Sequence, residues 1–166
     1  MLKALENKLA NLNGTSKGLM QITTFLYRLA ITCWIGGASL FTFVLTPIIF
    51  KSYNRDMAGG IVGALFPGYF KWGLICGVIA LAAIFMPSTV KHKTVAAVII
   101  AVMLAITSVQ AFVIEPRAAA LKKEIPSFET TPKDDPLRVR FRKLHGVSAV
   151  SNLAVIVGGI VLIVLL

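Results

Sequence analysis

Four apolar stretches, each long enough to cross a lipid bilayer, constrain this chain more than any other feature of its sequence. They lie at about residues 22–48, 70–86, 94–113 and 146–166. A hydrocarbon core of about 30 Å takes about 20 apolar residues in helical form. Strands exposed to lipid would leave backbone groups without partners, whereas a helix satisfies its own. We therefore predict an all-α membrane protein, built as a four-transmembrane-helix bundle.

The composition favours lipid over water as the solvent. Hydrophobic residues make up 57% of the chain and charged residues only 14%, against about 25% charged residues in soluble domains. The net charge is +10, but the Lys and Arg residues fall almost entirely between the apolar stretches, where lipid headgroups lie. The sequence carries no nucleic-acid-binding motif. We expect the bilayer and its anionic lipids as partners, and no nucleic acid.

Residues 1–20 are predicted to form an interfacial segment outside the transmembrane domain of residues 21–166. Leucines recur at helical spacing from Leu2 to Leu12 among polar residues, a pattern typical of an amphipathic helix that lies on the membrane surface. Asn13-Gly14 is a turn signal, and we expect it to end this helix. The segment is too polar for a cleavable signal peptide.

Prolines and polar runs predict where the spans end. Proline inside a helix removes a backbone hydrogen bond, so we expect the first span to end at Pro47, the second at Pro87 and the third at Glu115-Pro116-Arg117. Residues 51–70 and 117–143 are predicted as the two long connections between spans.

Two further predictions concern helix ends and helix contacts. The second long connection is expected to hold a helical turn at residues 118–123, and residues 137–146 (LRVRFRKLHG) the interfacial start of the last helix. Trp34, Gly36 and Gly37 are expected to let a neighbouring helix approach the first span closely. The two helical hairpins show no obvious resemblance to each other.

The distribution of basic residues predicts an orientation. One side of the membrane would carry five Lys residues, and the other eleven Lys and Arg residues. Because the side richer in Lys and Arg faces the cytoplasm, both long connections are expected there and both termini outside. The five are Lys3, Lys8, Lys17, Lys91 and Lys93; the eleven are Lys51, Arg55, Lys71, Arg117, Lys122, Lys123, Lys133, Arg138, Arg140, Arg142 and Lys143.

The start of the last span carries the most informative polar residues. His145, Ser148 and Asn152 fall on one helical face, and polar groups inside a membrane usually face the protein interior. Three other polar residues are expected at a similar depth, namely Gln110, Glu115 and Tyr69. The cluster is either a small functional site or a set of interhelical hydrogen bonds that hold the bundle together.

His145 is the only candidate metal ligand inside the membrane. The other histidine, His92, lies in the loop at the opposite face, about 30 Å away, so the two cannot bind one metal within a monomer. Neighbouring residues complete no convincing ligand set. Haem or copper therefore stays an open possibility, with no cofactor assigned.

Other charged and reactive residues have simpler interpretations. The basic run of Arg138, Arg140, Arg142 and Lys143 is predicted to sit on anionic headgroups, and Arg28 to extend toward the headgroups from the first span. Cys33 and Cys76 lie too far apart in depth to form a bridge.

Three ordered motifs resemble those of the transmembrane protein 205-like family, also called domain of unknown function 4149. The first is Trp34-Ile35-Gly36-Gly37. The second contains Phe66-Pro67 and Tyr69-Phe70. The third contains Leu144-His145-Gly146, with Ser148 and Asn152-Leu153 after it. The resemblance covers about residues 22–166 and implies a four-helix membrane domain. The family is distantly similar in architecture to copper-resistance-D-like membrane proteins and to a haem-bearing type of protoporphyrinogen oxidase.

Three functions remain open at this point. The first is a multi-pass protein without catalytic activity that supports transport or export, which predicts a polar cavity around His145, Asn152 and Gln110. The second is a haem- or metal-binding oxidoreductase subunit, which the resemblance brings in. The third is a structural or assembly subunit. A homo-oligomer or a membrane partner is compatible with each.

Overall fold

In a computed structural model, the part of the chain that is described folds into helices only. The structure describes the backbone of residues 1–165, and all their side chains except those of residues 2 and 4–11. The elements are α1 (Leu2–Leu40), η1 (Phe41–Leu45), α2 (Thr46–Ser52), α3 (Arg55–Phe85), α4 (Lys93–Val109), η2 (Gln110–Ile114), α5 (Glu115–Glu124) and α6 (Pro136–Val164). Here η1 and η2 are π-helical turns within longer helices.

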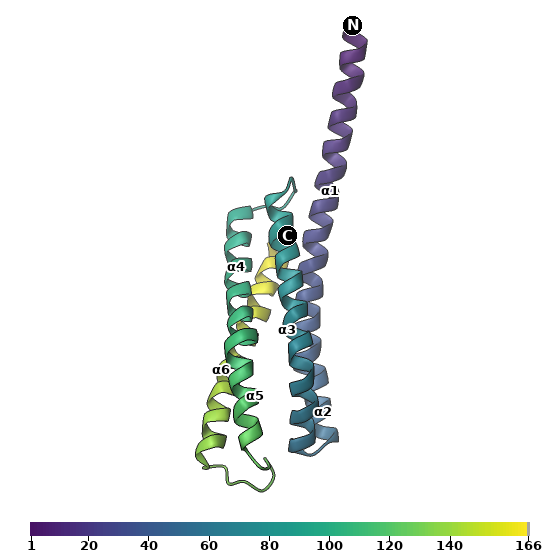
Figure 1. Ribbon diagram of the computed structural model, residues 1–166. Coiled ribbons are helices and arrows are strands. Elements are labelled where there is room, and N and C mark those ends of the chain that lie inside the picture. Colours follow the sequence, from purple (N-terminus) through teal and green to yellow (C-terminus); the bar gives the residue numbers. More distant parts are fainter. Residues whose placement is uncertain (166) are drawn as a thin grey trace.

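The elements join into four rods that run up and down in one bundle (Figure 1). The first rod is α1–η1–α2, the second α3, the third α4–η2–α5 and the fourth α6. α1 packs against α3 and α6, and α4 packs against the same two helices. Four helices are long and apolar enough to cross a membrane. Their outward side chains include many large apolar groups, such as Phe25, Phe43, Phe112 and Val157, and surfaces of this kind mark contact with lipid. The predicted four-transmembrane-helix fold is confirmed.

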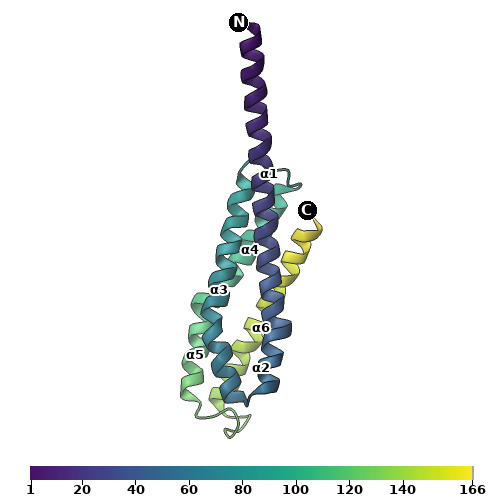
Figure 2. The same ribbon diagram turned by 90° about the vertical axis from the view of Figure 1, so that its right-hand side faces the viewer.

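The prediction that Asn13-Gly14 ends a separate N-terminal helix is wrong. α1 passes through both residues without a break, and its first turns extend beyond the bundle along the bundle axis (Figure 2). The bundle proper begins near Thr23 and Thr24, whose hydroxyls contact Pro87 O and Thr89 Oγ1 in the α3–α4 loop. Helix propagation adds one hydrogen bond for each residue fixed, so a single glycine costs only about 1 kcal/mol and does not stop a long helix.

The predictions that Pro47 and Pro116 end their spans are also wrong. Each proline follows a π-helical turn, and the helix continues beyond it as α2 or α5. The proline ring would collide with the carbonyl four residues earlier, which belongs to Phe43 or Phe112. Both carbonyls lie within π turns, where the extra residue per turn moves the carbonyl away from the ring.

The two π turns also show that the hairpins resemble each other, contrary to expectation. Residues 43–47 read FVLTP and residues 112–116 read FVIEP. In both, the residue before proline donates its backbone N–H five residues back, to Phe41 O or Gln110 O. α1 and α4 run in the same direction, as do α3 and α6 (Figure 1). The two hairpins therefore run in the same direction, and each carries a π turn before a proline at the corresponding place.

Both long connections are shorter than predicted. α3 begins at Arg55 because the Asn54 side chain accepts a hydrogen bond from Met57 N at 2.9 Å, which caps the helix. After α5, only residues 125–135 connect to α6. α6 begins at Pro136 behind Asp135, whose side chain accepts from Leu137 N at 2.9 Å. The helical interpretation of residues 137–146 is confirmed.

The α5–α6 connection is fastened to the start of α3. The Asp56 carboxylate accepts from Ser127 Oγ at 2.5 Å and from Phe128 N at 2.6 Å. Glu129 Oε1 accepts from Arg55 N at 2.7 Å. Charge-assisted hydrogen bonds of this kind are the stronger ones, so they hold the α5–α6 connection over the end of α3.

Glycines allow α1 and α3 to approach closely. Trp34 is buried, and a Cβ added to Gly73 or Gly77 would lie 2.7 or 2.6 Å from its indole. On the other side, Trp72 donates to Cys33 O at 3.2 Å and lies against Gly37. The prediction for Trp34 and Gly37 therefore holds. Gly36 does not take part, because nothing lies within 4 Å of the position of its Cβ.

We predict that Gly77→Ala destabilises the bundle by about 1–3 kcal/mol, because overpacking forces rigid side chains apart. The added methyl would meet the Trp34 indole at 2.6 Å and Leu104 at 2.5 Å. Gly68→Ala, in the same helix with open space at its Cβ, should be neutral or stabilising by up to about 1 kcal/mol. Thermal unfolding of the two purified variants in detergent measures both; equal midpoints would contradict this packing.

Candidate functional site

A chain of hydrogen bonds joins three helices near the middle of the bundle. Asn152 Nδ2 in α6 donates to Thr42 Oγ1 in η1 at 2.6 Å. The Tyr69 hydroxyl in α3 donates to Asn152 Oδ1. One amide therefore satisfies a donor and an acceptor from two other helices, as polar groups in a membrane require.

A second pair lies one turn away on α6. Ser148 Oγ donates to Gln110 Oε1 at 3.0 Å, and Gln110 is only 2% exposed. We refer to Thr42, Tyr69, Gln110, Ser148 and Asn152 as the polar core. Thr42 comes from the first π turn and Gln110 from the second, so each π turn contributes one side chain to the polar core.

The polar core itself leaves no room for a ligand. A cavity of about 10 Å³ touches Tyr69, Gln110 and Asn152, and this volume admits no more than about one water molecule. Its groups already have partners within the protein. The hydrogen bonds of the polar core therefore join α3, α6 and the two π turns and leave no space for a ligand between them.

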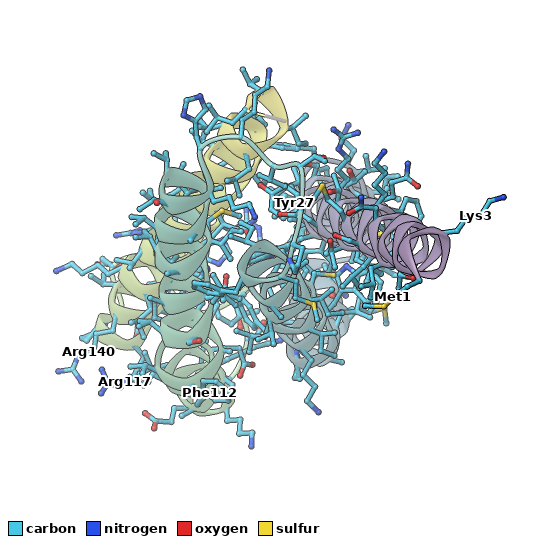
Figure 3. All side chains as sticks on the ribbon, turned by 90° about the horizontal axis from the view of Figure 1, so that it is seen from above. Met1, Lys3, Tyr27, Phe112, Arg117 and Arg140 are labelled. Carbon is cyan, nitrogen blue, oxygen red and sulfur yellow. The ribbon has the colours of Figure 1, made fainter. Side chains whose placement is uncertain are left out.

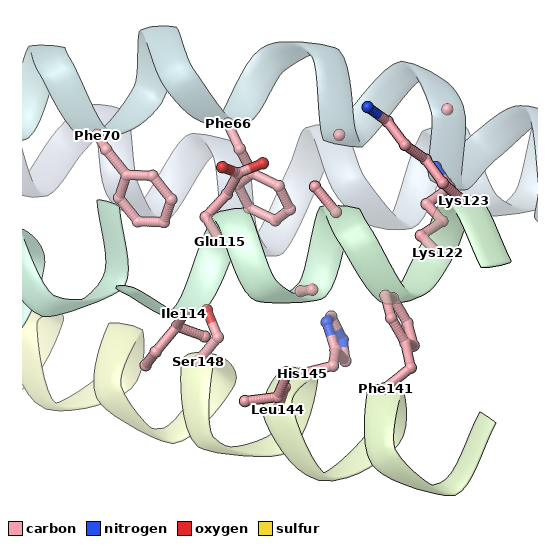
Figure 4. Close-up of a pocket in the computed structure, with 15 residues that line it drawn as sticks. Phe66, Phe70, Ile114, Glu115, Lys122, Lys123, Phe141, Leu144, His145 and Ser148 are labelled. Carbon is pink, nitrogen blue, oxygen red and sulfur yellow. The ribbon is translucent and has the colours of Figure 1, made fainter. Parts of the chain in front are cut away.

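A larger cavity lies next to the polar core, between α3, α5 and α6 (Figure 4). This inner cavity has a volume of about 340 Å³, within the range of small-molecule sites. Its walls are mainly apolar, from Phe66, Phe70, Ile114, Phe141 and Leu144. Its polar groups include Glu115, Lys122, His145 and Ser148.

His145 faces the inner cavity and stays out of the polar core. Its ring is stacked on Phe141, with 6.1 Å between the ring centroids and 6° between the planes. Ser148 lines the same cavity, yet its hydroxyl bonds to Gln110 rather than to His145. The predicted cluster is thus divided: Tyr69 and Asn152 meet, Ser148 and Gln110 meet, and Glu115 and His145 lie at the cavity wall.

A second cavity opens beside the first and is lined by basic residues. It measures about 570 Å³ and shares Gly59, Phe66, Lys122, Phe141 and His145 with the inner cavity. We call it the basic cavity, because Arg55, Lys122, Lys133, Arg138 and Arg142 line it.

The side chains of the predicted basic run point in different directions. Arg138 turns inward: its guanidinium donates to Thr131 O and lies 5.5 Å from the centroid of the Phe128 ring. Arg142 lines the basic cavity. Arg140 points away from the bundle, as does Arg117 (Figure 3). Successive residues of a helix face different directions, so Arg138 and Arg142 share a face that Arg140 does not.

The sequence did not single out Lys122. Its ammonium group lies over two glycines of α3, where a Cβ added to Gly59 or Gly63 would be 3.3 or 3.7 Å from Nζ. The signal was present as small residues four positions apart, which mark close approach in membrane helices. Thr42 was missed as well, since nothing in an apolar run reveals a π turn.

Among the described residues, no group of three His, Cys, Asp or Glu side chains is arranged to hold a metal ion. Cys33 and Cys76 are free thiols. His92 is the N-cap of α4, whose start lies at the opposite end of the bundle from the start of α6, the helix that carries His145 (Figure 1). His145 therefore remains the single imidazole near the two cavities.

We predict that Tyr69→Phe and Asn152→Leu are coupled. In membrane proteins, the coupling free energy of one interhelical hydrogen bond averages about 0.6 kcal/mol and reaches about 1.7 kcal/mol. The double variant should therefore lose less stability than the sum of the single ones, by an amount in that range. Unfolding of the four proteins in mixed detergent micelles gives this difference, and strictly additive losses would contradict the bond.

Comparisons with known proteins give a family and one relative. The family model described as "Domain of unknown function (DUF4149)" matches residues 29–127. These residues include the motifs around Trp34 and Phe66, but the motif at His145 lies beyond them. An uncharacterized protein of Aquifex aeolicus (strain VF5) is 29% identical over 126 residues, which cover 76% of this chain and 83% of the relative. No solved structure matches.

Proposed function

This chain belongs to the DUF4149 family, and we propose that it is a multi-pass membrane protein without catalytic activity that binds an amphiphilic molecule and supports its transfer across the bilayer. The observation that carries the proposal is the inner cavity. Its volume of about 340 Å³ lies between α3, α5 and α6, next to the polar core, and most of its wall is aromatic or aliphatic. Sites for small molecules have this form, with a few polar groups that fix orientation.

The polar groups of the inner cavity favour binding over catalysis. A nucleophile needs a base within hydrogen-bond reach. Ser148 Oγ is the hydroxyl at the cavity wall, and it is committed to the Gln110 amide at 3.0 Å. Glu115, Lys122 and His145 lie around an apolar interior. This arrangement suits a molecule with a polar end and an apolar body.

The sequence left two other functions open, a haem- or metal-binding oxidoreductase subunit and a structural or assembly subunit. Both can be distinguished from transfer of an amphiphile. A metal centre finds no set of three ligands among the described residues. Haem would be held by His145, and the arginines and Lys122 of the basic cavity would offer positive charge for its carboxylates. The similarity to the transmembrane protein 205-like and copper-resistance-D-like proteins rests on motifs alone and stays a prediction, as do cytoplasmic long connections and an assembly role.

We expect Ala118→Trp to block binding in the inner cavity. Ala118 lines this cavity, so an indole there fills part of the space that a ligand needs. Ala120 is exposed and does not line the cavity, so Ala120→Trp is the matched control. Reconstituted protein is illuminated with an uncharged monoacylglycerol that carries a diazirine in its acyl chain, and labelled peptides are mapped by mass spectrometry.

The proposal requires labelling at residues 59–70 and 114–148 in the natural chain and in Ala120→Trp, and its loss in Ala118→Trp. Vesicles containing the natural chain should also move a fluorescent monoacylglycerol between leaflets faster than vesicles containing Ala118→Trp. Labelling that is indifferent to Ala118→Trp, or equal transfer rates, would refute the proposed function.

An absorption spectrum of the gently purified protein tests the haem alternative. A Soret band that disappears in His145→Ala would establish haem in place of a transferred amphiphile. Protein without such a band, but with labelling of the inner cavity, supports the proposed function.

A further inference from the structure

The charges that line the basic cavity are all of one sign. Five Lys and Arg side chains line it, and no Asp or Glu is among the described residues of its wall. Arg55, Lys133 and Arg142 are exposed, and Lys122 and Arg138 are half-buried. Like charges gathered on one wall repel one another, and an anion bound between them would relieve this repulsion. The composition of this wall therefore calls for an anion.

The acidic residues nearest to this wall are already engaged. Asp56, which interacts electrostatically with Lys122, accepts hydrogen bonds from Ser127 and Phe128. Glu129 accepts from Arg55 N. These bonds hold the α5–α6 connection in place. Even with both negative charges counted, the five cations that line the basic cavity remain in excess.

Lys122 is held in position for a ligand. Its stem is half-buried, and Nζ lies over Gly59 and Gly63 because neither glycine has a side chain in the way. Arg142 lies on α6, one turn beyond Arg138, and lines the same cavity. One ligand can therefore meet an ammonium from α5 and a guanidinium from α6.

Apart from Thr46 and His145, the rest of the wall of the basic cavity is apolar. Its wall includes Pro47, Phe50, Val62, Phe66, Phe128 and Phe141. These residues extend from the end of the first rod along α3 to α6. A free inorganic anion would leave this surface without a partner, whereas an acyl chain would cover it.

We infer that the basic cavity binds an anionic phospholipid, with its phosphate between Lys122 and Arg142 and an acyl chain along the apolar wall toward the inner cavity. Guanidinium groups bind phosphate in a bidentate manner, and basic pockets between transmembrane helices are a known setting for such headgroups. Five cations suit a phosphate monoester, which carries about −1.5 to −2 charges near pH 7, better than a carboxylate with a single charge, and this favours phosphatidic acid over a fatty acid. This inference rests on the proposed function and names the class of molecule that it acts on.

The test is native mass spectrometry of the full-length protein in mild detergent. The protein is titrated with dioleoylphosphatidic acid and, separately, with dioleoylphosphatidylcholine, which has the same chains and no net charge. We expect the anionic lipid to bind more tightly. Lys122→Met and Arg142→Gln should each weaken it by about tenfold or more, the loss expected for one hydrogen bond between charged groups.

The controls are Arg117→Gln and Arg140→Gln, because both side chains point away from the bundle (Figure 3). They remove the same charge and should leave the affinity unchanged. Lys122→Arg should retain most of it. Equal losses in the control variants, or equal affinity for the two lipids, would overturn the inference. So would displacement by millimolar inorganic phosphate, or oleate binding with the same dependence on Lys122.

The two proposals fail separately. Labelling by the uncharged monoacylglycerol depends on the inner cavity and not on charge. If that labelling persists while phosphatidic acid binds no better than phosphatidylcholine, only the choice of an anionic phospholipid is wrong. If phosphatidic acid binds selectively while Ala118→Trp changes neither labelling nor transfer, the transfer function is wrong.

Discussion

Every backbone amide and carbonyl within lipid must find its partner inside the protein, and two prolines in this chain make that difficult. Pro47 and Pro116 each lack an N–H and carry a ring that would collide with the preceding turn. The chain responds in the same way twice, with a π turn just before the proline. The helices continue instead of ending, which is why the first and third rods reach Ser52 and Glu124. Each π turn also carries a residue of the polar core, Thr42 in the first and Gln110 in the second, and α5 carries Lys122.

The two cavities follow from this extension of the rods. α5 continues the third rod past the polar core and carries Lys122 to the glycines of α3. α6 begins at Pro136, directly after its Asp135 cap, so that Arg138, Arg142 and His145 lie on this helix and line the basic cavity together with Lys122. The α5–α6 connection is fastened by Asp56 and closes the end of the bundle. The result is an apolar space with a basic rim at one end of a membrane bundle. Such a space matches a molecule with an anionic head and an apolar tail.

The sequence predicted the fold class and the four spans well because length and hydropathy are nearly sufficient in a membrane. It predicted the ends of the helices poorly. Pro47, Pro116 and Asn13-Gly14 are strong stop signals in water. Here the π turns accommodate the prolines, and the cooperative propagation of a long helix carries it through Asn13-Gly14. The site was foreseen in part, since helical spacing put Ser148 and Asn152 on one face. Their partners depend on how four rods are rotated against each other, which periodicity does not specify. Lys122 looked like one of many loop lysines until α5 and Gly59 gave it a position.

The shared direction of the two hairpins has a consequence for how such a chain can arise. A unit with two spans leaves the membrane on the side where it entered. A second copy appended to it therefore inserts the same way round, with no need for an ancestor that tolerated both orientations. Both FV-x-x-P segments would then fall at one depth from the outset. In this register Thr42 pairs with Ala111 and Gln110 with Phe41, so the two copies would since have placed their polar side chains one position apart, and each would contact the last helix differently.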